Sequence, residues 1–206
     1  NIIDIGLNVV DKSLSLSSKL LNKNFSNFKI FSIEPTDYAF KKQINNINLN
    51  PILKKKISLF RYFVSNKKNK LKKTYSNWSL NDNLNSHKIH KGILKTINKS
   101  TKNITLDNFI KINKIQNQII LKIDVDGFEM NVLKSCIKTL STKNPIIFME
   151  YAPYSLLEHG SSLKEFNSFI RKYNYEIFDL NFHRLGKVEI NDGSSTDIVL
   201  IKNSKN

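Results

Sequence analysis

Cysteine is nearly absent from the 206 residues: Cys136 stands alone, which excludes an internal disulfide framework and a zinc site built from several cysteines. A reducing, cytoplasmic location is the expectation. No apolar run approaches the roughly 18 residues that a membrane span needs. No secretory signal is recognised either, because the opening apolar run at 1–5 ends at Gly6, although its abrupt start leaves open that residues precede it.

Arginine is also scarce, with 3 residues beside 30 lysines. The chain therefore has few guanidinium groups, whose bidentate hydrogen bonds are the commonest means of recognising bases in nucleic acids. Sequence-specific binding of nucleic acid is therefore not expected. The net charge is +16, but 28 asparagines and 27 isoleucines accompany the lysines, as AT-rich codons would produce. With 40% hydrophobic residues in one domain's length, the chain is expected to fold as a soluble globular domain spanning 1–206.

The position of the charge is more informative than its sum. Residues 38–106 contain 16 basic side chains and one acid, Asp82, whereas the rest of the chain has 17 basic and 16 acidic side chains. Codon bias accounts for lysines but not for missing acids. The segment predicts a cationic face for an anionic acceptor, with peripheral contact to an anionic membrane as a further possibility. Its part at about 66–103 is expected to be an irregular, lysine- and asparagine-rich excursion.

Apolar runs alternate with helical patterns along the chain. Strands are expected at 2–5, 28–33, 57–64, 119–123, 145–149, 175–180 and 197–201. Helices are expected after Gly6, after Pro35, at 105–112, along an apolar stripe at 128–140, and from the capping pattern at Ser162 through Tyr173. Such alternation predicts an α/β, doubly wound, mostly parallel sheet with one antiparallel strand near the C-terminus. Ligands of this class bind beyond the carboxyl ends of the strands.

Two strand ends carry residues suited to a nucleoside-containing ligand. Asp4, Gly6 and Asn8 follow the first strand, where a glycine lets the backbone approach a ligand and the next helix offers free N–H groups. Glu34 ends the second strand, where a carboxylate can accept both hydroxyls of a ribose. A plain turn for Gly6, and a helix N-terminal acid for Glu34, are the structural alternatives.

Two later strand ends carry carboxylates. Asp124, Asp126 and Glu129 follow the strand at 119–123 and could position a substrate, a cationic group or a metal. Glu150 ends the next strand and could act as a general base, or serve only a structural hydrogen bond. No metal site is expected, because the spacing of these acids does not demand one and the four histidines lack ligand spacing. His87 and His90 alone lie close together.

Together these pieces resemble the FkbM-type family of S-adenosylmethionine-dependent methyltransferases over almost the whole length. The matching segments are Asp4-Ile5-Gly6 with Asn8, Ile33-Glu34-Pro35, Thr105-Leu106-Asp107, the run at 122–129, and Met149-Glu150. The resemblance implies a Rossmann-like sheet of seven strands and methyl transfer to an oxygen, commonly of a sugar, a glycan or a secondary metabolite. It implies S-adenosylmethionine as the cofactor.

Residue roles follow from the resemblance. Asp4, Gly6 and Asn8 would line the methionine end of the cofactor, Glu34 its ribose, and Ser65 or Asn66 its adenine. Asp124 would lie in the same site, with Asp124 and Glu150 as the catalytic candidates. The chain departs from the family at Val10, where a second glycine is usual. A crowded cofactor loop, and with it an inactive copy, therefore remains open.

Two other functions compete with methyl transfer. A nicotinamide-dependent oxidoreductase would use Glu34, but it needs a G-x-G-x-x-G loop that this chain lacks. A non-catalytic module with the same fold would use the basic segment to hold a polyanion. The acceptor, its methylated position and the oligomeric state are not encoded in any recognisable pattern.

Overall fold

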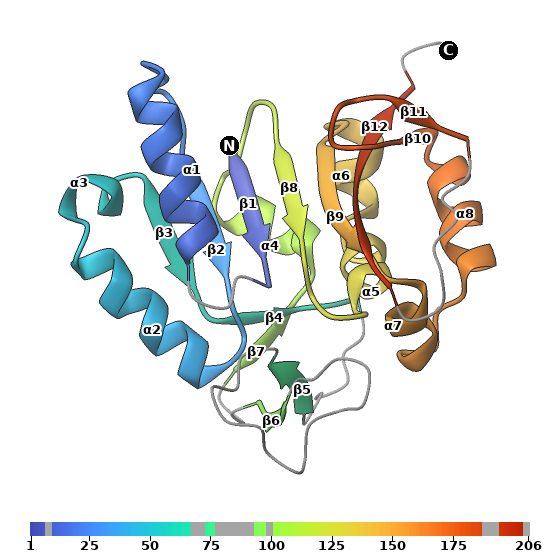
Figure 1. Ribbon diagram of the computed structural model, residues 1–206, viewed down its shortest axis with the longest axis horizontal. Helices are drawn as coiled ribbons and strands as arrows, with labels where there is room; N and C mark the ends of the chain where they lie inside the picture. The colour runs from blue at the N-terminus through green and yellow to red at the C-terminus, as the bar shows by residue number, and fades with distance from the viewer. Residues whose placement is uncertain (7–9, 67–72, 77–92, 98–100, 187–193, 204–206) are drawn as a thin grey trace. The chain divides into compact units, whose positions relative to one another are not determined.

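The computed structural model describes residues 1–6, 10–66, 73–76, 93–97, 101–186 and 194–203 (Figure 1). The fold divides into two compact units. The first unit contains residues 1–5, 64–66 and 104–206, and the second contains residues 6–63 and 67–103. The single domain expected from the sequence stays a prediction, and most of its expected excursion at 66–103 lies outside the described residues.

The first unit is built on a sheet with the strand order β11-β10-β12-β9-β8-β1. β1, β8 and β9 are parallel neighbours, and β12 runs antiparallel to both β9 and β10. The bounds are β1 Ile2–Ile5, β8 Ile120–Ile123, β9 Ile146–Tyr151, β10 Tyr175–Phe178, β11 Arg184–Leu185 and β12 Thr196–Lys202. The antiparallel strand expected near the C-terminus is thereby confirmed as β12.

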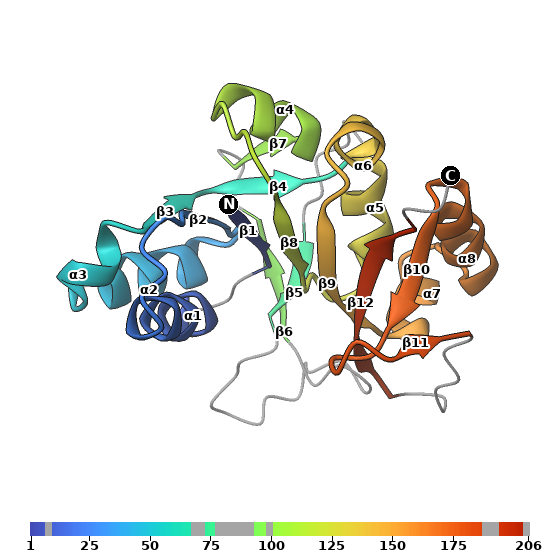
Figure 2. The ribbon, with the colours of Figure 1, turned by 90° about the horizontal axis from the view of Figure 1, so that it is seen from above.

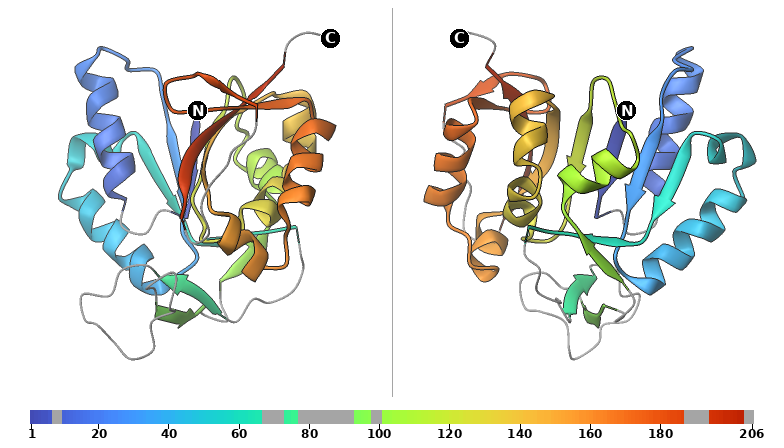
Figure 3. Two further views of the ribbon diagram at one scale, coloured as in Figure 1. Left: turned by 45° about the vertical axis from the view of Figure 1, so that its right-hand side comes forward. Right: turned by 180° about the vertical axis from the view of Figure 1, so that it is seen from behind.

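Helices α4, α5, α6 and α8 lie on one face of this sheet (Figures 2 and 3). Their side chains bury a core that includes Phe109, Leu133 and Phe166, all fully inaccessible to solvent. Together with α7, the bounds are α4 Leu106–Ile112, α5 Glu129–Lys134, α6 Ile137–Thr142, α7 Pro153–Glu158 and α8 Leu163–Lys172. Ser162 caps α8 as its sequence pattern predicts, accepting a hydrogen bond from the backbone N–H of Glu165 at 3.1 Å.

The apolar stripe at 128–140 is not one helix, as the sequence suggested, but the two helices α5 and α6. The break occurs at Ser135, whose hydroxyl donates to the carbonyl of Val132 and accepts from the N–H of Leu106. Asp107 then caps α6 from outside, accepting from the N–H groups of Lys138 and Thr139, both at 2.9 Å. The motif residue Asp107 therefore has a structural role.

In the second unit, β2 and β3 pair in parallel, and α1 and α2 lie on one face of the pair (Figure 2). The bounds are α1 Asp11–Asn22, β2 Ile30–Ile33, α2 Asp37–Asn48, α3 Pro51–Lys54 and β3 Ile57–Phe60. A separate antiparallel pair is formed by β5 (Lys73–Ser76) and β6 (Ile93–Thr96).

The strand expected at 57–64 is also divided. It ends at Phe60, and after Arg61 the chain continues as β4 (Tyr62–Val64), which pairs with β7 (Lys102–Ile104) instead of extending β3. The six strands in the sheet of the first unit, together with β2 and β3 of the second, are eight, one more than the seven expected; the pairs β4–β7 and β5–β6 are separate from them. The extra strand is the two-residue β11.

Candidate functional site

A lysine joins two of the predicted site carboxylates in the first unit. Asp4 of β1 lies opposite Lys122 of β8 in the parallel register. The Lys122 Nζ is 3.0 Å from Oδ2 of Asp124 and 3.5 Å from Oδ1 of Asp4. Asp124 lies two residues beyond Lys122, and its backbone N–H donates to the carbonyl of Ile5 at 3.0 Å. Both acids are thus brought together at the carboxyl ends of β1 and β8.

Lys122 was not identified as a site residue from the sequence. The available signal was its spacing, because residues two apart in or just after a strand can project to the same side. The Asp4 side chain is 5% exposed and that of Asp124 27%, so the lysine compensates charge in a poorly solvated environment. The ion pair with Lys122 holds the Asp124 carboxylate in place, which suits orienting a ligand better than removing a proton.

The turn after β8 is held by Glu129. Its Oε1 accepts hydrogen bonds from the N–H of Gly127 at 3.1 Å and of Val125 at 3.3 Å. The side chain is fully buried, and burial raises its pKa to about 7 in spite of these backbone hydrogen bonds. Gly127 has φ +97°, and a Cβ there would lie 2.5 Å from the carbonyl oxygen of Ser155. Glu129 therefore has a structural role, because it holds the backbone of the turn between β8 and α5.

Glu150 lies within β9 and is half-buried. Its Oε1 accepts a hydrogen bond from the Ser195 hydroxyl at 2.6 Å. Tyr154, another residue that sequence reasoning missed, lies nearby in α7. Burial is the main cause that raises the pKa of Tyr154, and the charge of Glu150 adds to the effect, followed by Asp126. The phenol of Tyr154 and the carboxylates of Glu150 and Asp126 therefore lie near one another in the first unit.

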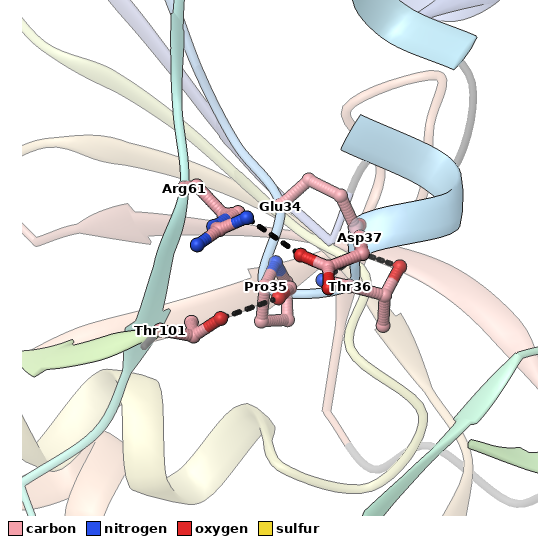
Figure 4. Close-up of polar contacts among 6 residues, drawn as sticks. All are labelled: Glu34, Pro35, Thr36, Asp37, Arg61 and Thr101. Atoms are coloured by element: carbon pink, nitrogen blue, oxygen red, sulfur yellow. Dashed lines mark hydrogen bonds and ion pairs between the residues drawn. The ribbon is translucent and has the colours of Figure 1, made fainter. Parts of the chain in front are cut away.

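In the second unit, Glu34 follows β2 and is buried (Figure 4). Its Oε1 accepts two hydrogen bonds from Thr36, one from the backbone N–H at 2.8 Å and one from the hydroxyl at 2.5 Å. Thr36 occupies the N-cap position of α2, yet its side chain does not cap the helix. Its hydroxyl is used to orient the carboxylate of Glu34.

The residues around Glu34 are fixed by two further contacts (Figure 4). Arg61 Nη1 lies 2.6 Å from Oδ1 of Asp37, which ties the link between β3 and β4 to the first turn of α2. Thr101 donates its hydroxyl to the carbonyl of Pro35 at 3.2 Å. The turn that carries Glu34 is therefore held from both sides within the second unit.

Gly6 belongs to the same unit and has φ +88°. The N–H of Gly6 donates to the carbonyl of Ile33 at 3.1 Å. Ile33 is the last residue of β2 and directly precedes Glu34, so Gly6 lies beside the end of β2. Val10 has φ +65° and is fully buried, a conformation in which a β-branched residue is a strong outlier. The position favours glycine, which is the physical reason why the departure at Val10 matters. Asn8 lies outside the described residues.

The other predicted residues are less informative. Ser65 is buried, and its N–H donates to the carbonyl of Ile104 at 3.0 Å, whereas Asn66 is exposed. His87 and His90 lie outside the described residues. Within the part of the chain that the structure describes, no group of three or more histidine, cysteine or acidic side chains is arranged to hold a metal ion. The same part contains no helix with the length and apolar character of a membrane span.

Comparison with known families decides the family question. The model of the methyltransferase FkbM domain matches residues 4–177. The chain belongs to this family. The resemblance inferred from the sequence is thus confirmed, and the matched region contains Asp4, Glu34, Asp124 and Glu150. No curated protein matches the chain.

Solved structures show the same fold. The FkbM methyltransferase from Methylobacillus flagellatus KT superimposes with a TM-score of 0.56 at 14% identity, over 97% of this chain and 43% of that one. A putative rRNA methylase from Clostridium thermocellum gives 0.52 at 10% identity, over 100% and 87%. A precorrin-6y C5,15-methyltransferase from Geobacter metallireducens GS-15 gives 0.50 at 10% identity, over 98% and 80%.

These likenesses establish a Rossmann-like α/β fold for this member of the FkbM family. The chain spans less than half the length of the Methylobacillus flagellatus protein.

Proposed function

We propose that this chain is an S-adenosylmethionine-dependent O-methyltransferase whose acceptor is a hydroxyl group of a sugar, glycan or secondary metabolite. Family membership supports methyl transfer. The observation that carries the choice of cofactor is the buried carboxylate of Glu34 at the end of β2, fixed in orientation by Thr36. A buried, oriented acid in this position suits the two hydroxyls of a ribose.

Each unit, taken by itself, contains residues that suit one part of such a cofactor. Thr36 holds the Glu34 carboxylate in a fixed orientation, as a group that accepts ribose hydroxyls must be held. Gly6 has no Cβ to obstruct a ligand, and its positive φ is a conformation that other residues adopt only at a cost. Asp4 and Asp124 supply carboxylates for a cationic amino-acid group, with Lys122 compensating part of their charge.

When bound, S-adenosylmethionine would supply a methyl group already activated on a sulfonium sulfur. The protein must then align the acceptor oxygen and remove the hydroxyl proton. We assign the proton to Glu150, whose carboxylate accepts a hydrogen bond from Ser195. Asp124 is assigned to orientation, because its carboxylate is already engaged in an ion pair with Lys122. Glu150 would receive the hydroxyl proton as the acceptor oxygen takes the methyl group from the sulfonium sulfur.

Calorimetry with S-adenosylmethionine and with NAD tests the cofactor. We expect binding of S-adenosylmethionine alone, and Glu34→Ala should weaken it by about 2 to 4 kcal/mol, or roughly 30-fold or more, through the loss of charge-assisted hydrogen bonds. Asp37→Ala is the matched control, because Asp37 is a neighbouring acid that pairs with Arg61. Unchanged affinity in Glu34→Ala would remove Glu34 from the cofactor site.

The charge of residues 38–106 supports an anionic acceptor, such as a phosphorylated or uronic sugar. The same charge supports the second candidate, a non-catalytic module that holds an anionic glycan or another polyanion. The strained conformation of Val10, where the family usually has glycine, also favours a module that does not bind the cofactor. Methyl transfer to a panel of neutral and acidic sugars separates the two. Glycan binding without any affinity for S-adenosylmethionine would favour the module.

A further inference from the structure

Three apolar side chains in and between α2 and α3 of the second unit are exposed, and exposed lysines precede and follow them along the chain. Leu49 is 79% exposed and Ile52 is 74% exposed, while Ile44 is 40% exposed. Lys41 and Lys55 flank them and are exposed as well. We name these five residues the α2–α3 face, since α3 follows closely after the end of α2 (Figure 1).

The helical register explains this arrangement. α2 buries Ala39, Gln43 and Ile47, four residues apart, against the rest of the unit. Lys41 and Ile44 are three residues apart and therefore share another side of the helix. α3 begins at Pro51 and buries none of its residues. The aliphatic groups of the face are thus presented to solvent.

The charge within residues 38–60 has one sign, because they contain five lysines and no acid. The acid that precedes them, Asp37, forms an ion pair with Arg61. Lys54 is held against the face by donating to Oδ1 of Asn48 at 3.0 Å, and Lys42 lies over the ring of Tyr38 at 4.6 Å. Long lysine stems can cover apolar surface while their ammonium groups stay in water.

We propose that the α2–α3 face binds the surface of an anionic membrane. Exposed aliphatic groups bordered by lysines match a lipid interface, where the apolar groups enter the headgroup boundary and the ammonium groups meet lipid phosphates. A soluble polyanion would engage the lysines but would leave Leu49 and Ile52 in water. A second copy of the chain would cover the aliphatic groups but bring lysines against lysines. The lipid surface alone satisfies both features.

Sedimentation with vesicles tests this proposal without reference to methyl transfer. The protein is mixed with vesicles of phosphatidylcholine alone, or of phosphatidylcholine and phosphatidylglycerol at about seven to three, and the bound fraction is measured against salt. We expect binding to the anionic vesicles only, weakening as salt rises. A protein that proves inactive as a methyltransferase would still show this binding.

Two variants separate the contributions. Leu49→Ser with Ile52→Ser should weaken binding at least about tenfold, because two aliphatic groups no longer leave water. Lys41→Gln with Lys55→Gln should weaken it about 20-fold, at roughly fivefold per lysine. Since all four side chains are exposed, circular dichroism should show unchanged folding.

Matched controls lie in the first unit. Ile112 and Leu180 are 62% and 53% exposed, and their double change to serine should leave vesicle binding unaltered. Lys111→Gln with Lys164→Gln is the corresponding charge control, since both lysines are exposed on helices of the first unit.

Three results would overturn the proposal. The first is an absence of binding to anionic vesicles. The second is binding that the lysine variant weakens and the serine variant does not, which would indicate a polyanion site. The third is self-association in solution that the serine variant abolishes, which would indicate that a second copy covers the face.

Discussion

Thr36 donates both its backbone N–H and its hydroxyl to one oxygen of Glu34, at 2.8 and 2.5 Å. A residue in an N-cap position normally uses its side chain to cap its own helix. Here the hydroxyl does not cap α2 but donates to the carboxylate that we propose for the cofactor ribose, so the N-cap residue of α2 orients that carboxylate.

Replacing this hydroxyl should weaken the cofactor site more than the fold. Thr36→Val removes one hydrogen bond to a charged acceptor while keeping the shape, and we expect the affinity for S-adenosylmethionine to fall roughly tenfold. Thr36→Ser keeps the hydroxyl and should retain affinity. Thr101→Val is the control, because Thr101 donates to Pro35 and not to Glu34. Equal losses in Thr36→Val and Thr101→Val would show a general disturbance of the turn.

Removing the Lys122 cation should destabilise the first unit through uncompensated charge. In Lys122→Met, the buried Asp4 loses its ammonium partner, and we expect the free energy of unfolding to fall by about 1 to 3 kcal/mol. Adding Asp4→Asn should recover part of this loss in urea denaturation. If the double variant were less stable than Lys122→Met, lost packing would be the cause instead.

The conformation of Val10 predicts that Val10→Gly is more stable than Val10→Ala, the reverse of the order usually found for these two residues. Alanine is normally more stabilising than glycine by about 0.5 to 1 kcal/mol, but at φ +65° its Cβ is strained. Both variants lose the buried valine side chain, and only glycine relieves the strain. We therefore expect Val10→Gly to unfold at a higher urea concentration than Val10→Ala and to bind S-adenosylmethionine at least as tightly as the wild type. The usual order would show that Val10 is not strained.

Glu129 should make stability depend on pH. Burial raises its folded pKa from 4.5 to about 7, so between these values the folded state holds a proton that the unfolded state has released. The free energy of unfolding should therefore fall as pH rises through this window, by on the order of 3 kcal/mol in total, and level off above it.

Comparison with Glu129→Gln isolates this contribution from the other acids. The stability of the variant relative to the wild type should increase between pH 4.5 and 7 in urea denaturation. Glu165→Gln is the control, because Glu165 is partly exposed and pairs with Lys134. A difference between Glu129→Gln and the wild type that stays constant with pH would contradict the buried, protonated state.

The sequence by itself determined the order of seven strands of the large sheets and of the main helices between them. It also determined the family and the positions of Asp4, Glu34, Asp124 and Glu150 at or near strand ends. These features are local, because apolar periodicity and turn residues act over a few neighbours along the chain. The cap of α8 at Ser162 is such a case. The breaks at Arg61 and Ser135 were missed because each depends on a partner distant in sequence, β7 for one and Leu106 for the other.

Only the tertiary structure decided what the site residues contact. The pairing of Lys122 with Asp4 arises from the register of β1 and β8, which are more than a hundred residues apart along the chain. The burial of Glu129 and the exposure of Leu49 likewise depend on which surfaces other elements cover. Charge compensation and desolvation are set by neighbours in space, so they follow from packing and not from the order of residues along the chain.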